Sequence, residues 1–287
     1  MDIEQARTFL AISAHGSFLE AARRLHVTQS TVSARIQALE AELGVRLFVR
    51  NRSGASPTPA GRRFHRHAKT LVLIVEQARH DVGLPSRFRA SIRIGGRIAL
   101  WDGFLPRWVD WMRHVAPDVS VRSEIGFEED LMRRLIEGTM DIGLMYTPSH
   151  VPDLVVEHLF DETLVLISSR RDTRWPGADY IYVDWGPGFY ARHRESYPDL
   201  ERPPLSVNIG WLGVQLILAN GGSCFLPIRM AQPLIDAGRI FKVDKGPEID
   251  HPAYMVFPRE ADSEVLREAV RGLRELAREE QQGAVTA

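Results

Sequence analysis

The sequence predicts a multidomain protein that consists of an all-α winged helix-turn-helix domain, a long linker helix and an α/β domain. Two short amphipathic helical patterns with a tight connection occupy residues 17–44, and an apolar repeat with heptad spacing follows in residues 59–84. From residue 91 onward, short apolar stretches alternate with amphipathic helical patterns, which is typical of an α/β domain. The chain has 287 residues and is 44% hydrophobic, so each part has enough apolar content to bury a core.

The first helix of the pair is predicted to begin after Ser17, a good N-cap residue that is followed three positions later by Glu20. Its apolar residues recur at positions i, i+3, i+4 and i+7, namely Phe18, Ala21, Ala22 and Leu25. His26 and Val27 then leave room only for a short turn. The pattern predicts a short helix that buries one face, with a tight elbow behind it.

The second helix is predicted to begin after Thr28, another good N-cap residue, and to end at Gly44. Its apolar face contains Val32, Ile36, Leu39 and Leu43. The opposite face and its edges carry small or amide side chains, namely Gln29, Ser30, Thr31, Ser33, Ala34 and Gln37. A helix in the DNA major groove needs such side chains, because they let the backbone approach and match the donors and acceptors of base edges. Arg35 lies nearer the apolar face, so we expect it to reach a phosphate or to pack its stem.

Residues 45–52 alternate as a strand does and lead into the turn-rich segment 53–57, which predicts a hairpin. Arg50 and Arg52 would make this hairpin a basic wing beside the groove. The alternative is a helix pair with a solvated hairpin that only packs against the rest of the chain. Charge favours the wing, because residues 1–90 carry 14 Lys and Arg against 7 Asp and Glu, whereas residues 91–287 carry 22 against 30. A cationic amino-terminal part suits a polyanion, and an acidic remainder is repelled by it.

A linker helix is predicted over residues 59–84, with Thr58 as its N-cap, Pro59 at its first position and Gly83 and Pro85 at its end. Six small or apolar residues are spaced by alternating steps of four and three, namely Phe64, Ala68, Leu71, Val75, Ala78 and Val82. A seam this regular is typical of a helix that pairs with a second copy, so we expect a homodimer. The alternative is that the helix packs against its own domain. Two DNA-reading units on such a pair would face the two half-sites of a dyad-symmetric site.

The α/β part begins with the order β-α-β-α-β, in which a strand at residues 91–96 is followed by a helix at 105–115, a strand at 119–125, a helix at 129–137 and a strand at 141–145. A second set of apolar stretches follows at residues 164–169, 180–185, 212–219, 223–228 and 254–257, and an amphipathic helix at 262–281 closes the chain. Two lobes are therefore expected, lobe I from residues 91–160 and 250–287 and lobe II from residues 161–249.

A ligand cavity is expected between these lobes, since ligands of open α/β sheets bind beyond the carboxyl ends of the strands. The loops at residues 96–101, 146–148, 185–188 and 211–213 occupy such positions. The candidate residues in them are Gly96, Arg97, Ile98, Trp101, Tyr146, Thr147, Trp185 and Trp211. Three of the six tryptophans lie here, which favours an apolar or aromatic small-molecule effector of unknown identity. The alternative is that these tryptophans fill a core between the lobes.

The stretch FLAISAHGSFLEAARRLHVTQSTVSARIQALEAELGVRLFVRNR and the following TPAG closely resemble the DNA-binding domain of LysR-type bacterial transcriptional regulators. LIEGTMDIGLMY, ANGGSCFLP and PLIDAGRI extend the resemblance through the α/β part. The resemblance implies a winged helix-turn-helix over residues 1–58, a dimerising linker helix over 59–84, and an effector-binding and oligomerisation domain over 91–287. That last domain would consist of two Rossmann-like subdomains similar to type 2 periplasmic binding proteins.

The resemblance also assigns residues. It places Gln29, Ser30 and Ser33 at the base-facing positions of the family, and Arg50 and Arg52 where the wing touches the DNA backbone. The chain departs from the family at two places, with Ala34 where many members have an arginine, and with Leu100 and Trp101 where many have a serine or threonine that binds a carboxylate effector.

No pattern typical of catalysis occurs, since the chain lacks GxSxG, HExxH, CxxC and a phosphate-binding glycine loop. We therefore expect no catalytic residue, no cofactor and no metal site. The single Cys224 excludes an intramolecular disulfide switch. Because no export signal and no apolar run of about 18 residues is found, the protein is expected to be cytoplasmic, without a membrane.

Together these patterns predict a regulator that binds dyad-symmetric, double-stranded promoter DNA as a homodimer or homotetramer, with RNA polymerase as a further partner. A small molecule between the lobes would modulate it. The alternatives are a ligand-independent architectural repressor and an enzyme of the binding-protein fold.

Overall fold

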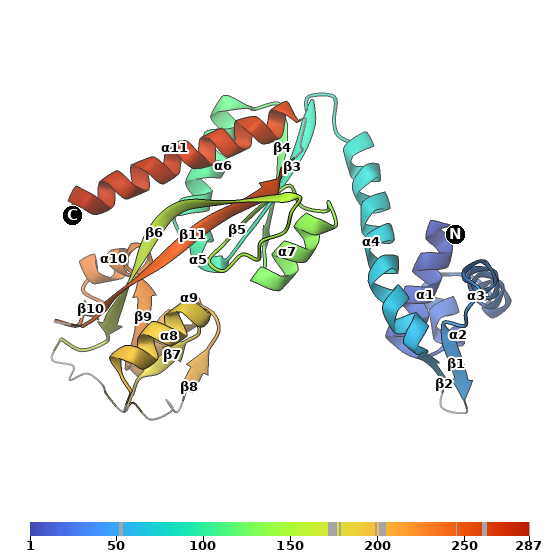
Figure 1. Ribbon diagram of the computed structural model, residues 1–287, viewed down its shortest axis with the longest axis horizontal. Coiled ribbons are helices and arrows are strands. Elements are labelled where there is room, and N and C mark those ends of the chain that lie inside the picture. Colours follow the sequence, from blue (N-terminus) through green and yellow to red (C-terminus); the bar gives the residue numbers. More distant parts are fainter. Residues whose placement is uncertain are drawn as a thin grey trace. The chain divides into compact units, whose positions relative to one another are not determined.

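The computed structural model describes residues 1–51, 54–171, 177, 179–198, 200, 205–244, 246–259 and 263–286. The chain divides into two compact units, Met1–Pro85 and Ser86–Ala287 (Figure 1). Each unit has a hydrophobic core of its own. Among the described residues, no helix is both long enough and apolar enough to cross a membrane.

The first unit contains the predicted helix pair, the hairpin and the long helix. Its elements are α1 (Ile3–His15), α2 (Phe18–Arg24), α3 (Gln29–Leu43), β1 (Phe48–Asn51), β2 (Gly54–Pro57) and α4 (Pro59–Val82). Phe9 lies at the centre of the core, with its ring centroid 5.0 Å from that of Phe48 and 4.9 Å from that of Phe64. These aromatic contacts join α1, the start of the hairpin and the start of α4 into one domain.

Side-chain caps place the helix boundaries where the sequence predicts them. The Glu20 N–H donates to Ser17 Oγ at 3.3 Å, and the Thr31 N–H donates to Thr28 Oγ1 at 3.2 Å. Between α2 and α3, His26 adopts a positive φ of 55°, which is uncommon for a residue other than glycine. The tight turn therefore holds the two helices at a defined angle.

The hairpin begins later than the sequence predicts, because the strand pattern from residue 45 becomes a strand only at Phe48. Glu40 of α3 causes the delay. Its Oε1 accepts the N–H groups of Leu47, at 2.6 Å, and of Phe48, at 3.1 Å. These charge-assisted bonds hold the approach to the hairpin against α3 instead of leaving it free to pair as a strand.

The second unit starts with the predicted β-α-β-α-β order, formed by β3 (Ala90–Gly96), α6 (Phe104–Val115), β4 (Val119–Ile125), α7 (Glu128–Ile136) and β5 (Ile142–Met145). A short additional helix, α5 (Ile98–Trp101), precedes α6 where a loop was predicted. β3 pairs in parallel with both β4 and β5. The later elements are β6 (Leu154–Ser168), β7 (Ile181–Val183), α8 (Pro187–Ser196), β8 (Leu205–Val207), α9 (Gly210–Asn220), β9 (Ser223–Pro227), α10 (Ile228–Asp236), β10 (Phe241–Lys242), β11 (Glu248–Pro258) and α11 (Glu264–Thr286).

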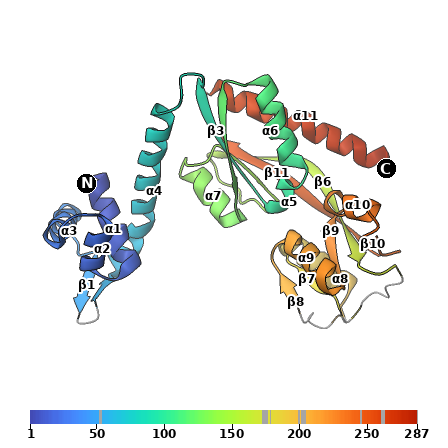
Figure 2. The same ribbon diagram turned by 180° about the vertical axis from the view of Figure 1, so that it is seen from behind.

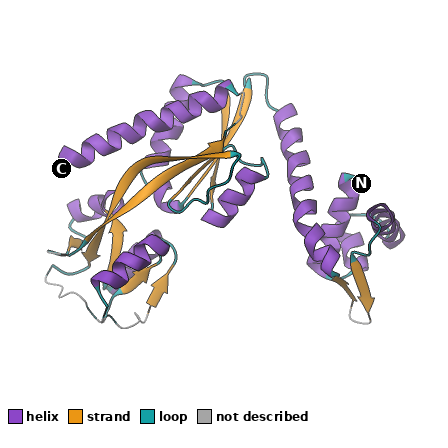
Figure 3. Cartoon of the chain, viewed as in Figure 1, coloured by secondary structure: helices purple, strands orange, loops and turns teal. Residues whose placement is uncertain are grey.

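The main sheet runs in the order β10-β6-β11-β5-β3-β4, and β9 also pairs with β6. α6 and α11 pack together on one side of its β3–β5 part, and α7 covers the other side over a separate apolar cluster (Figure 2). α8 and α9 lie beside the small parallel pair of β7 and β8, at the end of the second unit that is farther from β3, β4 and β5 (Figure 3).

Two strands are longer than the sequence predicts. Stretches expected at residues 164–169 and 254–257 are the ends of β6 and β11, which run as an antiparallel pair through both lobes. The predicted lobe boundaries near residues 160 and 250 therefore fall inside strands and not in loops. The register of the pair shifts at Ala253/Tyr254, opposite Phe160 and His158, so the crossing carries a β-bulge.

Candidate nucleic-acid interface and ligand cavity

The outward face of α3 has the small and amide side chains that the sequence predicts there. Gln29, Ser30 and Gln37 are exposed, while Thr31 and Ser33 are half-buried. The hydroxyl oxygens of Ser30 and Thr31 each lie 2.8 Å from Thr28 Oγ1. The first turn of α3 therefore presents a hydroxyl cluster whose positions are set by the helix cap.

Arg35 is held inside the first unit, in agreement with its place near the apolar face. Its guanidinium lies 3.1 Å from the Glu4 carboxylate and donates to Thr8 Oγ1 at 3.4 Å. This pair joins α3 to α1. Contact with a phosphate would require the guanidinium to exchange Glu4 for the phosphate.

The hairpin has the geometry of a wing. β1 and β2 are antiparallel, and the Ala55 N–H donates to the Gly16 carbonyl at 2.7 Å, which attaches the hairpin to the end of α1. Arg50 pairs with Ala55 in the ladder, but its side chain lies outside the described residues, as does the whole of Arg52. The predicted contacts of both arginines with the DNA backbone remain predictions.

One basic residue beside the wing was missed in the sequence. Arg46 is exposed, directly before the buried Leu47 that leads into β1. Its signal was the i, i+4 and i+6 spacing of Arg46, Arg50 and Arg52 along the approach to the turn. A third cation there would strengthen the attraction of the wing for phosphates.

The apolar seam of α4 is divided between two environments. Ala68 is fully buried, and Phe64 and Leu71 pack against the same core, which includes Phe9 of α1. This half of the predicted dimer seam packs at least in part against its own domain, because heptad spacing defines an apolar face and not the partner that covers it. Further along, Ala78 is exposed and Val82 is 89% exposed, so the carboxyl-terminal end of the seam is open to a second chain.

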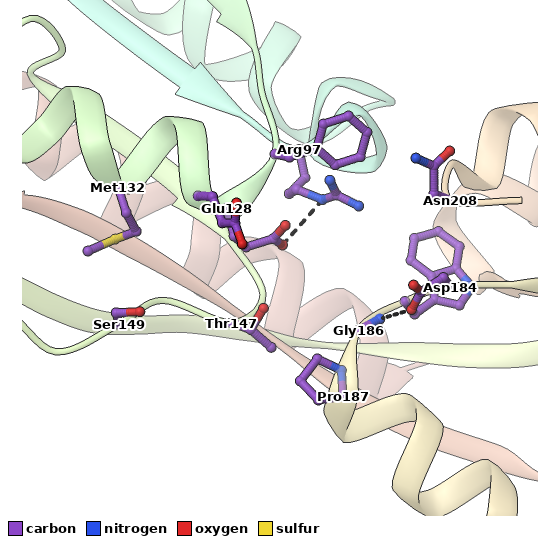
Figure 4. Close-up of a pocket in the computed structure, with 12 residues that line it drawn as sticks. Arg97, Glu128, Met132, Thr147, Ser149, Asp184, Gly186, Pro187 and Asn208 are labelled. Atoms are coloured by element: carbon purple, nitrogen blue, oxygen red, sulfur yellow. Dashed lines mark hydrogen bonds and ion pairs between the residues drawn. The ribbon is translucent and has the colours of Figure 1, made fainter. Parts of the chain in front are cut away.

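A cavity of about 520 Å³ opens between the lobes of the second unit (Figure 4). It is lined by Arg97, Phe127, Glu128, Glu129, Met132, Thr147, Ser149, Asp184, Trp185, Gly186, Pro187 and Asn208. Arg97, Glu128 and Thr147 come from the β3–β5 side, and Asp184, Gly186 and Asn208 from the β7–β8 side. The volume is within the range of sites for small organic ligands.

Of the eight residues predicted for this cavity, Arg97, Thr147 and Trp185 line it. The other five do not. Trp101 packs against the main core and donates its Nε1–H to the Glu124 carbonyl at 3.0 Å, whereas Trp211 is 52% exposed on α9. Tyr146 is buried in the core, and Gly96 and Ile98 lie outside the lining. Trp101 and Trp211 therefore do not line the cavity.

The acidic and amide lining residues are not among those that the sequence predicts for the cavity. Glu128 and Glu129 form the first turn of α7, and Asp184 directly precedes Trp185. Their signals were the acidic run EED at a helix start and the DWG turn. They escaped notice because an acidic first turn is ordinary helix stabilisation, and nothing local shows that it faces another lobe.

The Arg97 guanidinium is already partnered. Its Nε lies 3.3 Å from Glu128 Oε1, and its Cζ lies 4.5 Å from the centroid of the Phe127 ring. Arg97 is only 8% exposed. The one lining arginine is therefore neutralised by a carboxylate and stacked on an aromatic ring.

A buried polar network begins at Tyr146, whose ring centroid lies 6.4 Å from that of Trp185 in the lining, and extends to Glu162 and Arg229, which line a separate cavity of about 580 Å³. The Tyr146 hydroxyl donates to Glu162 Oε2 at 2.7 Å, and the other oxygen of Glu162 accepts from Arg229. Burial raises the pKa of the Glu162 carboxyl, although the Arg229 cation and the Tyr146 hydroxyl act against it. Burial also raises the pKa of Tyr146, with the Glu162 carboxylate adding to the shift. Neither group acts as a free charge at the cavity between the lobes.

His251 of β11 stacks against this network. Its ring centroid lies 4.0 Å from that of Tyr146 and 5.8 Å from that of Trp185. Burial, together with the Arg97 and Arg192 cations, lowers the pKa of His251 to about 3. The imidazole is therefore neutral at physiological pH.

Two family models match the chain. Residues 3–62 match the bacterial regulatory helix-turn-helix protein of the lysR family, and residues 86–282 match the LysR substrate binding domain. A similar protein is the HTH-type transcriptional regulator HdfR of Yersinia enterocolitica, which is 28% identical over 278 residues, 93% of this chain and 94% of the relative.

Solved structures share the fold. CbnR, a LysR family transcriptional regulator, matches with a TM-score of 0.76 at 20% identity over 96% of this chain and 99% of CbnR. Full-length CbnR complexed with its target DNA matches with a TM-score of 0.73 at 20% identity, over 96% of this chain and 100% of that one. LysG from Corynebacterium glutamicum with bound effector Arg gives a TM-score of 0.54 at 21% identity, over 96% of this chain and 98% of LysG.

Proposed function

Since the chain belongs to the LysR family of DNA-binding transcriptional regulators, we propose that it reads dyad-symmetric promoter sites through α3 and the wing, under the control of a small molecule in the cavity. The observation that carries the DNA-reading part is the outward face of α3. Gln29 and Ser30 are exposed in its capped first turn and Gln37 is exposed two turns later, and such amides and hydroxyls match base edges.

The residues have separate roles in this proposal. Gln29, Ser30 and Ser33 contact bases, and Thr31 and Gln37 contact the edges of the same groove. The arginines bind phosphates, with Arg46 added to the predicted Arg50 and Arg52. Arg35 supports α3 through Glu4 and reaches a phosphate only after exchange of that partner.

The effector acts by shifting a population of assembly shapes. A ligand that binds between the lobes changes DNA binding only if it favours one lobe arrangement over another. The β6–β11 pair crosses between the lobes at a β-bulge, which supports a change of angle there. In this proposal the lobe arrangement sets the spacing of the DNA-reading units and the access of RNA polymerase.

A second copy of the chain supplies the DNA-reading unit for the second half-site. The carboxyl-terminal end of α4 carries exposed apolar residues, among them Ile74 and Val82, which a second α4 would cover. The assembly is a homodimer or a homotetramer. Sedimentation of Val82→Asp beside the unaltered chain tests this, since a charge in the seam should yield monomers, and an unchanged mass would place the interface elsewhere.

The DNA-reading proposal is tested by recovery of genomic fragments on the purified protein at two salt concentrations. The unaltered protein should enrich a shared dyad motif, with affinity that falls steeply as salt rises. Gln29→Ala and Ser33→Ala should each weaken binding to that motif by about 1–3 kcal/mol. Gln215→Ala, which removes an exposed glutamine of α9 in the other unit, is the matched control. Recovery without a motif, unaffected by the α3 substitutions, would instead favour architectural binding.

A further inference from the structure

We infer that the ligand of the cavity between the lobes is an organic amine, in which an ammonium group is joined to an apolar or aromatic group. This inference rests on the proposed effector role of the cavity and names the chemical class of its ligand. Three features of the lining support this inference, namely an arginine that is paired with a carboxylate, an excess of carboxylates and the aromatic rings of Phe127 and Trp185.

The charge of the arginine is already balanced by a nearby carboxylate, although its Nε–H is buried without a hydrogen bond. Among the described residues that line the cavity, Arg97 is the one cation, and it faces Glu128 at 3.3 Å (Figure 4). It also stacks on Phe127. A ligand carboxylate would have to displace the Glu128 carboxylate from its place. That exchange replaces one ion pair by another and leaves Glu128 without its partner, so it gains little.

Carboxylates outnumber cations in the lining. Glu128, Glu129 and Asp184 oppose the single Arg97, which leaves a net charge of −2. Glu129 and Asp184 are both exposed and line the cavity from opposite lobes. An ammonium group between them would interact with a carboxylate of each lobe and would favour the closed arrangement.

The amino-terminal ends of α7 and α8 both border the cavity, and their dipoles favour an anion. Together they contribute about one positive charge, which is less than the excess of two carboxylates. The Asp184 side chain already lies at the amino-terminal end of α8, because its Oδ1 accepts the Gly186 N–H at 2.9 Å. The local field therefore remains negative.

The apolar part of the ligand is matched by the rest of the lining. Trp185, Phe127, Met132 and Pro187 border the cavity. Trp185 is fixed in place, since its Nε1–H donates to the Phe225 carbonyl at 2.9 Å. Aromatic rings beside carboxylates bind organic ammonium groups, because both attract the positive charge.

Calorimetric titration of the full-length protein with three compounds that carry a phenyl ring on a short alkyl chain tests the inference. They are 2-phenylethylamine, 3-phenylpropanoate and 3-phenylpropan-1-ol. The amine should bind at least tenfold more tightly than the other two compounds. Asp184→Asn and Glu129→Gln should each weaken amine binding by roughly tenfold. Glu195→Gln removes an equal charge from an exposed position on α8 outside the lining and should change nothing.

A fourth variant reverses the preference. Glu128→Gln frees the Arg97 guanidinium, so 3-phenylpropanoate should bind roughly tenfold more tightly to this variant than to the unaltered protein. Equal or tighter binding of the carboxylate by the unaltered protein would overturn the inference. Failure of all three compounds to bind at about 10 mM would overturn it as well.

The outcomes separate this inference from the proposed function. Carboxylate or alcohol binding that is lost in Trp185→Ala would keep the cavity as the effector site and would reject only the amine. Loss of every ligand with retained motif-specific DNA binding would reject the effector part and keep the DNA-reading part.

Discussion

At the scale of single residues, Glu162 and Arg229 form an ion pair that is largely withdrawn from water. The Glu162 side chain is 3% exposed and that of Arg229 is 16% exposed. Arg229 also donates to the Ala99 carbonyl at 3.1 Å, so it connects α10 to β6 and to α5. Because the pair is buried, removal of one partner leaves the other charge uncompensated.

Arg229→Met is therefore expected to lower the free energy of unfolding by about 3 kcal/mol. The double variant Glu162→Gln/Arg229→Met should lose less than Arg229→Met alone, because no unpaired carboxylate remains. Urea denaturation of Arg229→Met, Glu162→Gln and the double variant measures these values. A loss in the double variant equal to the sum of the two single losses would show that the two side chains do not stabilise the fold as a pair.

The buried His251 makes stability depend on pH in a defined direction. The pKa of His251 is about 3 in the folded chain, against 6.5 for the ordinary side chain. Between pH 6.5 and pH 3, the imidazole is therefore protonated in the unfolded chain but stays neutral in the folded chain. The stabilisation is complete above pH 6.5 and is lost as the pH falls from 6.5 toward 3, by up to about 1.4 kcal/mol per pH unit.

His251→Phe keeps an aromatic ring beside Tyr146 and removes this titration. Between pH 6.5 and pH 5 the unaltered protein should lose about 1.5 kcal/mol more stability than the variant. Urea denaturation at the two pH values measures the difference. His193, whose pKa burial also lowers, contributes equally to both proteins and cancels. Equal losses of stability in the two proteins would show that the pH dependence does not come from His251.

At the scale of elements, the wing depends on a glycine at its tip. Gly54 has a φ of 129°, and a Cβ there would lie 2.3 Å from the Gly16 carbonyl oxygen. The neighbouring Ala55 N–H donates to that same oxygen. Any side chain at position 54 must therefore push the wing away from the end of α1.

Gly54→Ala should destabilise the first unit by about 2 kcal/mol and weaken DNA binding, since it combines backbone strain with a displaced wing. Gly44→Ala is the matched control, because Gly44 also has a positive φ but open space around it. Gly44→Ala should lower the free energy of unfolding by about 1 kcal/mol and leave DNA affinity unchanged. Thermal unfolding and DNA titration test both, and equal effects would rule out the clash with Gly16.

The elements of the first unit follow closely from local sequence. α3 and α4 begin and end where capping residues, proline and glycine predict, because these signals act within one helical turn. The partner of the α4 seam could not be predicted in this way. Ala68 and Leu71 face their own domain, whereas Val82 faces solvent, although all three obey the same spacing.

At the scale of the whole molecule, the chain contains two cores that share no residue. Unit Met1–Pro85 is built around Phe9, Ile36 and Leu39, and unit Ser86–Ala287 has two apolar clusters of its own. Each unit therefore buries its own apolar surface and is expected to fold without the other.

A fragment of residues 86–287 should unfold cooperatively, within a few degrees of the corresponding transition of the full chain. Calorimetry of the fragment beside the full-length protein measures this. A fragment without a cooperative transition would mean that residues 1–85 contribute to its core.

The sequence by itself determined the class of the protein, the helix boundaries of the first unit and the β-α-β-α-β start of the second. Caps, periodicity and motif spacing depend on residues close together in the chain, so the sequence alone shows them. Only the tertiary structure decided that Trp185 lines the cavity while Trp101 and Trp211 do not, and that Glu128 neutralises Arg97. It also decided that β6 and β11 run through both lobes. The physical reason is that the direction of a side chain and the partner of a charge depend on packing between segments far apart in the chain.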